Sequence, residues 1–385
     1  MSATFIFLLG NTPELSRIEL QAILPDAQFE ELSDQLISTT LTDTDFTPEQ
    51  LIEILGGTVK IFQVIKPLEV HAEIATIKTE ITEYIRAEFV KDFSVAELGR
   101  DHLEMIEAGE IKAILKRDGV ITRYVDGSRH GLSSAVLSHQ KVTEISVIQA
   151  ANYLVLAKTV AVQDIDQWTV RDRMKPYADR KKGMLPPKVA RMMVNLAVGP
   201  HPDKDSVLLD PFCGTGTILL EGLERQIRVI GSDLDAEATA GARGNIEWYR
   251  EQIIETIPEA TVLNQDATQL VLPKNQKIQY LVTEPFLGKP RPQPEQLPNI
   301  FKGIEKLYLG AFKQWRNVLA PGAKIVCVFP AVLSEHTPGY PTVTLKALID
   351  KLAHFGYTTT SESVVYHRPQ AVISRQIYQF TYKPE

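Results

Sequence analysis

Cysteine is scarce in this sequence, which has Cys213 and Cys327 as its two thiols among 385 residues. Two cysteines are too few for a disulfide scaffold or a cysteine-based zinc site, and the eight histidines are scattered rather than placed at zinc-ligand spacing. We therefore expect no metal ion, and we expect a protein from a reducing compartment.

A hydrophobic run long enough to cross a membrane is also missing. The apolar segment 3–9 has no basic region ahead of it and no small-residue cleavage site after it, so it predicts a strand rather than a signal peptide. We expect a soluble, cytoplasmic protein without a membrane partner.

The chain has no excess of positive charge, because 41 lysines and arginines face 48 acidic residues and the net charge is −7. This excludes a protein coated in basic residues for nonspecific binding of nucleic acid. The charge is nevertheless segregated: residues 1–60 carry ten acidic and two basic side chains, whereas residues 171–191 carry eight basic and two acidic ones. One face could therefore still hold RNA.

The length allows two or three domains, and we see no internal repeat or low-complexity tract. Hydrophobic periodicity predicts a β-α-β-α-β order in residues 1–70, as in a split-βαβ domain, and mixed helix and strand in residues 71–165. The expected strands are 5–9, 35–40, 58–64, 93–98, 120–124 and 153–162. The expected helices are 15–24, 47–55, 74–89 and 104–114.

From about residue 166 to 385, strands and helices alternate, which predicts a doubly wound parallel sheet. The expected strands are 206–210, 228–233, 261–264, 278–283 and 324–329, followed by an antiparallel hairpin of 357–366 and 374–381. The expected helices begin at 216, 236, 300 and 345.

A glycine-rich turn, Asp210–Thr217 (DPFCGTGT), follows the first of these strands directly. It lies at the carboxyl end of the strand, where open α/β sheets bind ligands. Gly214 and Gly216 allow a tight bend and close approach of a ligand, while an acid at the strand end can hold a cationic amine. A nicotinamide dehydrogenase fits less well, because its three-glycine pattern needs a small residue at Leu219.

Two further acids follow the next two strands. Asp233, in Asp233-Leu234-Asp235, occupies the usual place of a carboxylate that accepts hydrogen bonds from ribose hydroxyls, although Asp233 or Asp235 could instead cap the next helix. Asp266, in Asp266-Ala267, is placed to meet an adenine amine, with a simple turn or cap as the alternative.

The order of DPFCGTGT, GSDLD, QDAT and a strand ending in Thr283–Gly288 (TEPFLG) resembles the class I methyltransferases that alkylate exocyclic base amines. The segment from Arg171 to Lys188 resembles the entry to the catalytic domain of the THUMP-containing tRNA guanosine N2-methyltransferases, which modify position 10. Arg17, Glu19 and residues 55–61 resemble the N-terminal half of that family.

This resemblance implies a fold and a domain order. The fold is a Rossmann-like class I methyltransferase domain at 166–385, with a seven-stranded sheet and a C-terminal antiparallel hairpin. A ferredoxin-like domain at 1–70 and a THUMP-like RNA-binding domain at 71–165 precede it, both α+β.

The resemblance also implies S-adenosylmethionine as cofactor. The expected cofactor-binding residues are Asp210, Pro211, Phe212, Gly214, Thr215, Gly216, Thr217, Asp233, Leu234, Asp266 and Ala267.

The fourth motif carries the chemistry expected of the family. The lone pair of an exocyclic amine is delocalised into the ring, so acceptors must grip the amine hydrogens and orient the nitrogen, and an aromatic ring must hold the flipped base. The family uses an Asp or Asn, prolines and an aromatic residue. Here Thr283 stands in place of the Asp or Asn, followed by Glu284, Pro285 and Phe286. Either Glu284 supplies the carboxylate, or the protein has drifted to a weaker activity or another target.

The basic segment 171–191 is either a solvated connector or a surface beside the cofactor crevice. We expect it, with a loop at 288–292, to contact the substrate. The candidate substrate residues are Arg171, Asp179, Lys182, Lys188 and Lys289. Arg368 and Arg375, which flank the final hairpin, are candidates for contact with phosphate or simple surface residues.

The resulting hypothesis is methyl transfer to the N2 amine of a tRNA guanosine, with tRNA or another structured RNA as partner. The alternatives are an adenine N6-methyltransferase acting on DNA or RNA, and an RNA-binding protein that has lost its chemistry. Cys213 is less suited to nucleophilic catalysis than to packing within the turn. We expect a monomer, and the sequence leaves open whether a small activator subunit is needed.

Overall fold

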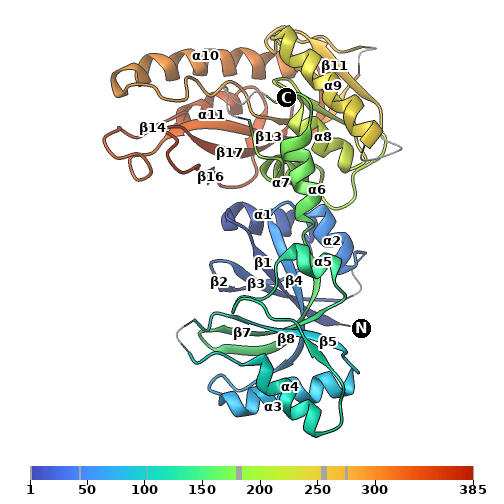
Figure 1. Ribbon diagram of the computed structural model, residues 1–385. Helices are drawn as coiled ribbons and strands as arrows, with labels where there is room; N and C mark the ends of the chain where they lie inside the picture. Colours follow the sequence, from blue (N-terminus) through green and yellow to red (C-terminus); the bar gives the residue numbers. More distant parts are fainter. Residues whose placement is uncertain are drawn as a thin grey trace. The chain divides into compact units, whose positions relative to one another are not determined.

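The computed structural model describes residues 2–42, 45–101, 103–178, 184–252, 258–273 and 276–384. The chain forms two compact units (Figure 1). The first comprises Met1–Arg17 and Pro25–Trp168, and the second comprises Ile18–Leu24 and Thr169–Glu385.

The first unit is built on one eight-stranded sheet with the order β2-β3-β1-β4-β8-β7-β5-β6. Its strands are β1 (Ala3–Leu9), β2 (Phe29–Ser33), β3 (Leu36–Leu41), β4 (Thr58–Pro67), β5 (Asp92–Leu98), β6 (Arg123–Tyr124), β7 (Thr143–Ala150) and β8 (Tyr153–Val162). Its helices are the first turns of α1 (Pro13–Ile23), then α2 (Pro48–Ile54), α3 (Ile74–Ala87), α4 (Ala108–Arg117) and α5 (Ser134–His139).

Local hydrogen bonding accounts for the start of helix α2. Helix α2 begins after Thr47, whose hydroxyl accepts from the amide of Gln50 while the Gln50 side chain accepts from the amide of Thr47.

Strand β4 pairs with β8, so residues 1–70 and 71–165, which we predicted as separate domains, share one sheet. The ferredoxin-like and THUMP-like assignments, and the division into three domains, stay predictions.

The second unit has a nine-stranded sheet, of which seven strands form a continuous path, β11-β10-β9-β12-β13-β17-β15. Its strands are β9 (Val207–Asp210), β10 (Arg228–Asp233), β11 (Ala260–Asn264), β12 (Ile278–Thr283), β13 (Leu319–Val332), β14 (Val343–Thr344), β15 (Tyr357–Thr359), β16 (Val364–Tyr366) and β17 (Ser374–Tyr382). Its α-helices are α7 (Pro187–Val198), α8 (Thr217–Glu224), α9 (Ala236–Gln252), α10 (Leu297–Trp315) and α11 (Lys346–Ala353). Helix α6 (Ile165–Thr169) belongs to the first unit up to Trp168.

The five strands from β11 to β13 are parallel and β17 is antiparallel, which confirms the predicted fold class. The predicted strand 357–366 is divided into β15 and β16, and both pair with β17. Helix α7 was not predicted. Within the described part of the chain, no helix is both long and apolar enough to span a lipid bilayer.

Both faces of this sheet are covered by helices. Helices α10 and α11 pack on one face. The contact includes an aromatic cluster, in which the ring centroid of Phe312 lies 4.6 Å from that of Trp315 and 4.9 Å from that of Tyr357. Helix α8 covers the other face, where Gly222 lies close to Val229 and Leu208. This packing fixes the strand ends that carry the candidate site.

Candidate functional site

Four neighbouring parallel strands, β11, β10, β9 and β12, end at the same edge of the sheet. Each carries a motif predicted from the sequence where the strand ends or just after it. These are Asp266 after β11, Asp233 on β10, Asp210 on β9 and Thr283-Glu284 on β12. The fold therefore brings the four motifs to the edge where open α/β sheets bind ligands.

The glycine turn after β9 depends on two glycines with positive φ, +50° at Gly214 and +87° at Gly216. A Cβ atom on Gly216 would lie 3.3 Å from the Cβ of Ala242 on α9, whereas one on Gly214 would meet no atom within 4 Å. Gly216 thus permits close packing against α9. Gly214 lies against open space, as a backbone cradle for a ligand requires.

Asp233 fastens this turn to β10. Its Oδ2 accepts from the amide of Gly214 at 2.9 Å, and its Oδ1 accepts from the amide of Asp235 at 2.9 Å. Each carboxylate oxygen has a second lone pair, so these bonds are compatible with ribose hydroxyls as further donors. Asp235 accepts from the amides of Glu237 and Ala238, which confirms the capping alternative for Asp235.

Asp210 is 1% exposed and lies at the centre of the strand edge. Its Oδ1 accepts from the Thr283 hydroxyl at 2.7 Å and from the Phe212 amide at 3.1 Å. Burial raises the pKa of this carboxyl to about 7, the two hydrogen bonds lower it, and the charges of Asp233 and Glu284 raise it. A cationic amine beside Asp210 would favour its ionised form.

The other cofactor candidates of the turn surround Asp210. Phe212 packs edge-on against Trp315 with ring centroids 6.4 Å apart, and Pro211 is buried. The Thr215 hydroxyl donates to the Met184 sulfur at 3.7 Å, beside a cavity of about 390 Å³. That cavity is lined by Asp172, Arg173, Ala178 and Met184.

Asp266 and Ala267 form the loop after β11. The Oδ1 atom of Asp266 accepts from both the amide and the hydroxyl of Thr268, each at 2.8 Å, so this oxygen shapes a turn. Ala267 is buried. Asp266 could meet an adenine amine only through Oδ2 or a second lone pair of Oδ1.

Thr283 is fully buried and its hydroxyl is a donor to Asp210. It links β12 to β9 within the sheet edge instead of offering an acceptor to a base. Thr283, which stands where the resembling family has an Asp or Asn, therefore supports the carboxyl group of Asp210 in this protein.

Glu284 forms an ion pair with Arg375 of β17, in which Arg375 Nε donates to Glu284 Oε1. The two side chains are 14% and 9% exposed, respectively. Burial raises the pKa of Glu284, while the charges of Arg375 and Arg368 lower it. A buried carboxylate held by a guanidinium is a fixed hydrogen-bond acceptor.

The two arginines of the last strands have structural partners that the sequence did not reveal. Arg375 lies over the Tyr366 ring, 5.9 Å from its centroid. Arg368 donates to the Met184 carbonyl and, at 3.4 Å, to the Tyr366 hydroxyl. The expectation that Arg375 contacts phosphate or decorates the surface is therefore wrong.

Two apolar side chains are exposed beside this strand edge. Phe286, two residues after Glu284, is 58% exposed, and Leu234, after Asp233, is 72% exposed. Pro285 between Glu284 and Phe286 is buried. Exposed rings and large aliphatic side chains at a ligand-binding edge are suited to contact purine faces.

Part of the basic segment 171–191 is a buried ionic cluster. Arg171 is 5% exposed and its Nη1 lies 2.8 Å from Glu224 Oε1, while Arg191 Nε donates to Glu221 Oε2 at 2.9 Å. The Tyr249 hydroxyl donates to Glu224. The structure contradicts the prediction of Arg171 as a substrate contact, because its guanidinium is enclosed by acids of α8.

The same segment is fastened to the glycine turn by residues that were not predicted. The buried Lys175 Nζ donates to the Thr217 hydroxyl at 2.9 Å, and burial lowers the pKa of Lys175 while Asp172 and Glu221 raise it. Asn245 Nδ2 donates to the carbonyls of Thr215 and Tyr177, both at 2.9 Å. Lysine in a basic run and asparagine in a helix carry no pattern that would have identified these contacts.

The remaining substrate candidates differ in their placement. Lys188 is half-buried, and burial followed by the charge of Arg171 lowers its pKa, whereas Lys289 is exposed. Asp179 and Lys182 lie outside the described residues. The substrate role of these four residues stays a prediction.

Cys213 is buried within the turn, and its pKa is raised well above the usual range by burial and by the charges of Asp210 and Asp233. It lies close to Gly231, where an added Cβ would be 3.0 Å from the sulfur. A thiol with a raised pKa is a poor nucleophile, so the site favours packing over catalysis by Cys213.

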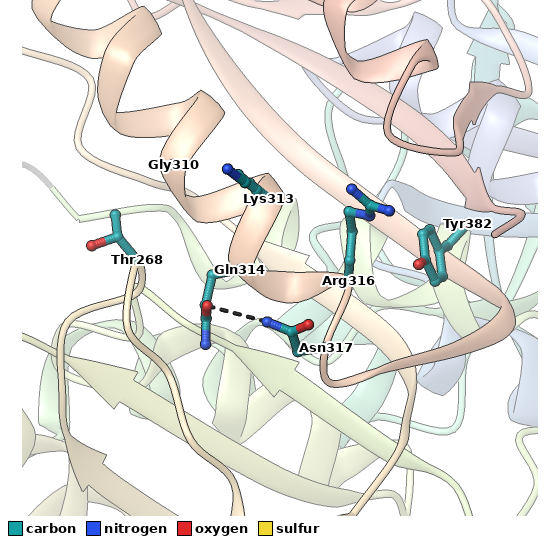
Figure 2. Close-up of a pocket in the computed structure, with 7 residues that line it drawn as sticks. All are labelled: Thr268, Gly310, Lys313, Gln314, Arg316, Asn317 and Tyr382. Carbon is teal, nitrogen blue, oxygen red and sulfur yellow. Dashed lines mark hydrogen bonds between the residues drawn. The ribbon is translucent and has the colours of Figure 1, made fainter. Parts of the chain in front are cut away.

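A second cavity, of about 540 Å³, lies at the end of α10 (Figure 2). Lys313 and Arg316 of this helix region contribute positive charge, and Gln314 and Asn317 are hydrogen-bonded to each other. Thr268 lines this cavity and also donates a hydrogen bond to Asp266 at the strand edge. The other lining residues are Gly310 and Tyr382.

Comparison with known proteins agrees with this geometry. Residues 176–331 match the family model described as RMKL-like, methyltransferase domain. The tRNA (guanine(10)-N2)-dimethyltransferase of Methanothermobacter thermautotrophicus is 34% identical over 151 residues, which cover 39% of this chain and 40% of the relative. The enzyme of the same description from Methanocaldococcus jannaschii is 33% identical over 109 residues, covering 28% and 29%. The chain thus aligns with less than half the length of these curated relatives.

Solved structures share the fold over the full length. TrmN from Thermus thermophilus has a TM-score of 0.56 at 16% identity, covering 99% of this chain and 100% of that one. SMU.472, a putative methyltransferase complexed with SAH, has a TM-score of 0.51 at 12% identity, covering 100% and 99%. At these identities the similarity shows the fold alone, that of Rossmann-like methyltransferases.

Proposed function

We propose that this protein transfers a methyl group from S-adenosylmethionine to the exocyclic N2 amine of a guanosine in tRNA. The observation that carries the proposal is the Glu284-Pro285-Phe286 motif, which places a fixed carboxylate and an exposed ring beside the Asp210 turn. The names of the aligned relatives supply guanine N2 in tRNA as the target, with position 10 as the expected nucleotide.

The strand edge fits the cofactor in three respects. Gly214 lies against open space, Leu234 is exposed where an adenine face would rest, and Asp210 is a buried carboxyl that a cationic amine would stabilise as the anion. We assign Asp210 to the methionine amine, the Gly214 turn to the backbone of the ligand, Asp233 to the ribose and Asp266 to the adenine amine. When bound, the cofactor supplies a methyl group on a positively charged sulfur.

The residues that directly follow β12 would prepare the acceptor. The Glu284 carboxylate and the main-chain carbonyl of Pro285 would accept the hydrogens of the target amine and aim its nitrogen, while Phe286 would stack on the flipped base. Once the new carbon–nitrogen bond forms, the amine carries one hydrogen too many. Glu284 is the acidic group on this motif that would accept that proton.

The RNA would also need a surface beyond the catalytic unit. We assign this role to residues 1–165, in line with the family resemblance. A monomeric protein and a cytoplasmic location are part of the same proposal.

Transfer of a radiolabelled methyl group tests the proposal, with unmodified tRNA transcripts, duplex DNA and no nucleic acid as parallel substrates. We expect label in tRNA alone. Glu284→Gln should lower kcat/KM for transfer to guanosine by about 100-fold or more and leave the Kd for the cofactor within about twofold, since Glu284 does not contact it in our assignment. Glu251→Gln, an exposed carboxylate at the end of α9, is the matched control and should keep full activity.

The outcomes separate the alternatives. Label in duplex DNA would favour the adenine N6 activity. Cofactor binding without transfer to any substrate would favour an RNA-binding protein that has lost its chemistry. Failure to bind the cofactor would exclude every methyltransferase function.

A further inference from the structure

The Glu284–Arg375 ion pair is held more rigidly than an ordinary surface pair. Arg375 lies on β17, where it pairs in register with Pro330 of β13. Its guanidinium also lies 5.9 Å from the centre of the Tyr366 ring. The carboxylate of Glu284 is thereby fixed at one oxygen, Oε1, by a nearly buried cation.

The cation also determines what Glu284 offers to a base. An ionised carboxylate accepts hydrogen bonds through both oxygens and donates none, whereas a protonated one is a donor as well. Burial alone raises the pKa of Glu284 and so favours the protonated form, and Arg375 opposes this effect. The ion pair with Arg375 stabilises the ionised form, in which Glu284 presents acceptors only.

Guanine and adenine differ in the atoms beside their exocyclic amines. On the Watson–Crick edge of guanine, the N2 amine is next to N1–H, so two donors lie side by side. On adenine, the N6 amine is next to N1, which is an acceptor. A carboxylate therefore matches guanine with two hydrogen bonds, while against adenine one of its oxygens would face the N1 lone pair without a hydrogen between them.

We propose that Glu284, held by Arg375, makes this site specific for guanine by accepting N1–H together with one N2–H of the base. The inference rests on the proposed transfer to a base amine and adds the group that selects the base. Arg375 acts as a positioning residue, because it touches Glu284 and not the base. The second N2 hydrogen is left to the Pro285 carbonyl, as assigned above.

The replacement Glu284→Gln gives the inference a sharp test. Glutamine offers one acceptor and one donor, so it no longer matches guanine but matches 2-aminopurine, which keeps the amine and has an acceptor at N1. The two enzymes should therefore have opposite preferences. A site that reads donors and acceptors in this way discriminates strongly, because a mismatched base leaves buried polar groups unpaired.

The experiment uses full-length protein and ligated tRNA with either guanosine or 2-aminopurine at the nucleotide that the wild-type protein methylates. For the wild type we expect kcat/KM to be about 100-fold higher with guanosine. For Glu284→Gln we expect the ratio of the two values to move toward 2-aminopurine by at least about tenfold. The comparison of ratios removes any effect of the O6 atom that 2-aminopurine lacks.

Variants of Arg375 test its positioning role. Arg375→Gln should lower kcat with guanosine and move the acidic limb of the pH–rate profile to higher pH, because Glu284 then gains a proton more readily. Arg375→Lys should restore part of both, and Arg250→Gln, at an exposed site on α9, should change neither. Cofactor affinity, measured for each variant, reports whether the protein remains folded.

Each outcome decides the matter. An unchanged preference in Glu284→Gln, or equal rates of the wild type on both bases, would overturn the inference while leaving the proposed function intact. A loss of rate in Arg375→Gln with an unmoved pH profile would refute the role of Arg375. If no tRNA guanosine is methylated at all, the proposed function fails and this inference fails with it.

Discussion

Replacing Thr283 by valine removes the hydroxyl that donates to Asp210 and keeps the shape of the side chain. The hydrogen bond is 2.7 Å long and fully buried, and it lowers the pKa of Asp210, which stands at about 7. A hydrogen bond to a charged group contributes about 1.5–3 kcal/mol, and 1.4 kcal/mol corresponds to a factor of ten. The proton affinity of Asp210 should therefore rise at least about tenfold in Thr283→Val.

The effect on cofactor binding follows from the ionised fraction of Asp210. With a pKa of about 7, half of the wild-type carboxyl is ionised at pH 7. A tenfold higher proton affinity leaves about one tenth ionised in the variant. If the ionised form is the one that binds the amine of the cofactor, the apparent Kd at pH 7 should rise about fivefold, and the difference should nearly vanish at pH 9.

Isothermal titration calorimetry with S-adenosylhomocysteine between pH 6 and 9 measures this directly. Thr283→Ser, which keeps the hydroxyl, is the matched control and should follow the wild type. A loss of affinity that is equal at all pH values, or no loss at pH 7, would refute the assignment of Asp210 to the amine.

Three further predictions concern substitutions of Asp210, Phe286 and Arg171. Asp210→Asn should abolish cofactor binding and stabilise the protein above pH 7, by up to about 4 kcal/mol in the free energy of unfolding. The variant gains stability because burial raises the pKa of Asp210 in the folded protein from 3.8 to about 7, so the wild type becomes less stable as the pH rises between these two values. Urea denaturation of both proteins at pH 4.5 and pH 8 measures the difference. Phe286→Ala should raise KM for tRNA about tenfold or more with little change in cofactor Kd, and Phe286→Tyr should retain activity, as steady-state kinetics would show. Arg171→Met should lower the free energy of unfolding by about 1.5–3 kcal/mol, because it removes one of the two arginines that pair with Glu224 and leaves Arg191 as the other, while tRNA affinity in filter binding stays unchanged. A selective loss of tRNA binding would revive Arg171 as a substrate contact.

The local part of the site was predictable from the sequence. The glycine turn, Asp233 and Asp266 each follow an apolar strand, and the carboxyl ends of neighbouring parallel strands meet at one edge. Gly214 and Gly216 also predicted a tight turn, and both have positive φ in the structure. Such features depend on residues close together in the chain.

The contacts between distant segments were not predictable. Arg375 lies 91 residues after Glu284, and the antiparallel register of β17 on β13 brings them together. Charge alone suggested that Arg171 and Arg375 face solvent or phosphate. In the structure Arg171 pairs with Glu224 of α8, and Arg375 pairs with Glu284, which directly follows β12. Thr283 was a catalytic candidate because it stands where the family has an Asp or Asn. Its hydrogen bond to Asp210 could not be foreseen, since it depends on how β12 and β9 are aligned.

The N-terminal half illustrates the same limit. The hydrophobic patterns of 58–64 and 153–162 correctly predicted two strands, and β8 has the bounds that we expected. The sequence did not indicate that β4 and β8 pair and join both segments in one sheet. Strand partners separated by nearly a hundred residues leave no local signal.

If the Glu284 motif directs methylation to the N2 amine of a tRNA guanosine, the modified nucleoside identifies it. The protein is incubated with unmodified tRNA transcripts and S-adenosylmethionine, the RNA is digested to nucleosides, and the product is identified by mass spectrometry. We expect N2-methylated guanosine with the wild-type protein and at least about 100-fold less with Glu284→Gln. N6-methyladenosine, or N2-methylated guanosine formed equally well by Glu284→Gln, would contradict this expectation.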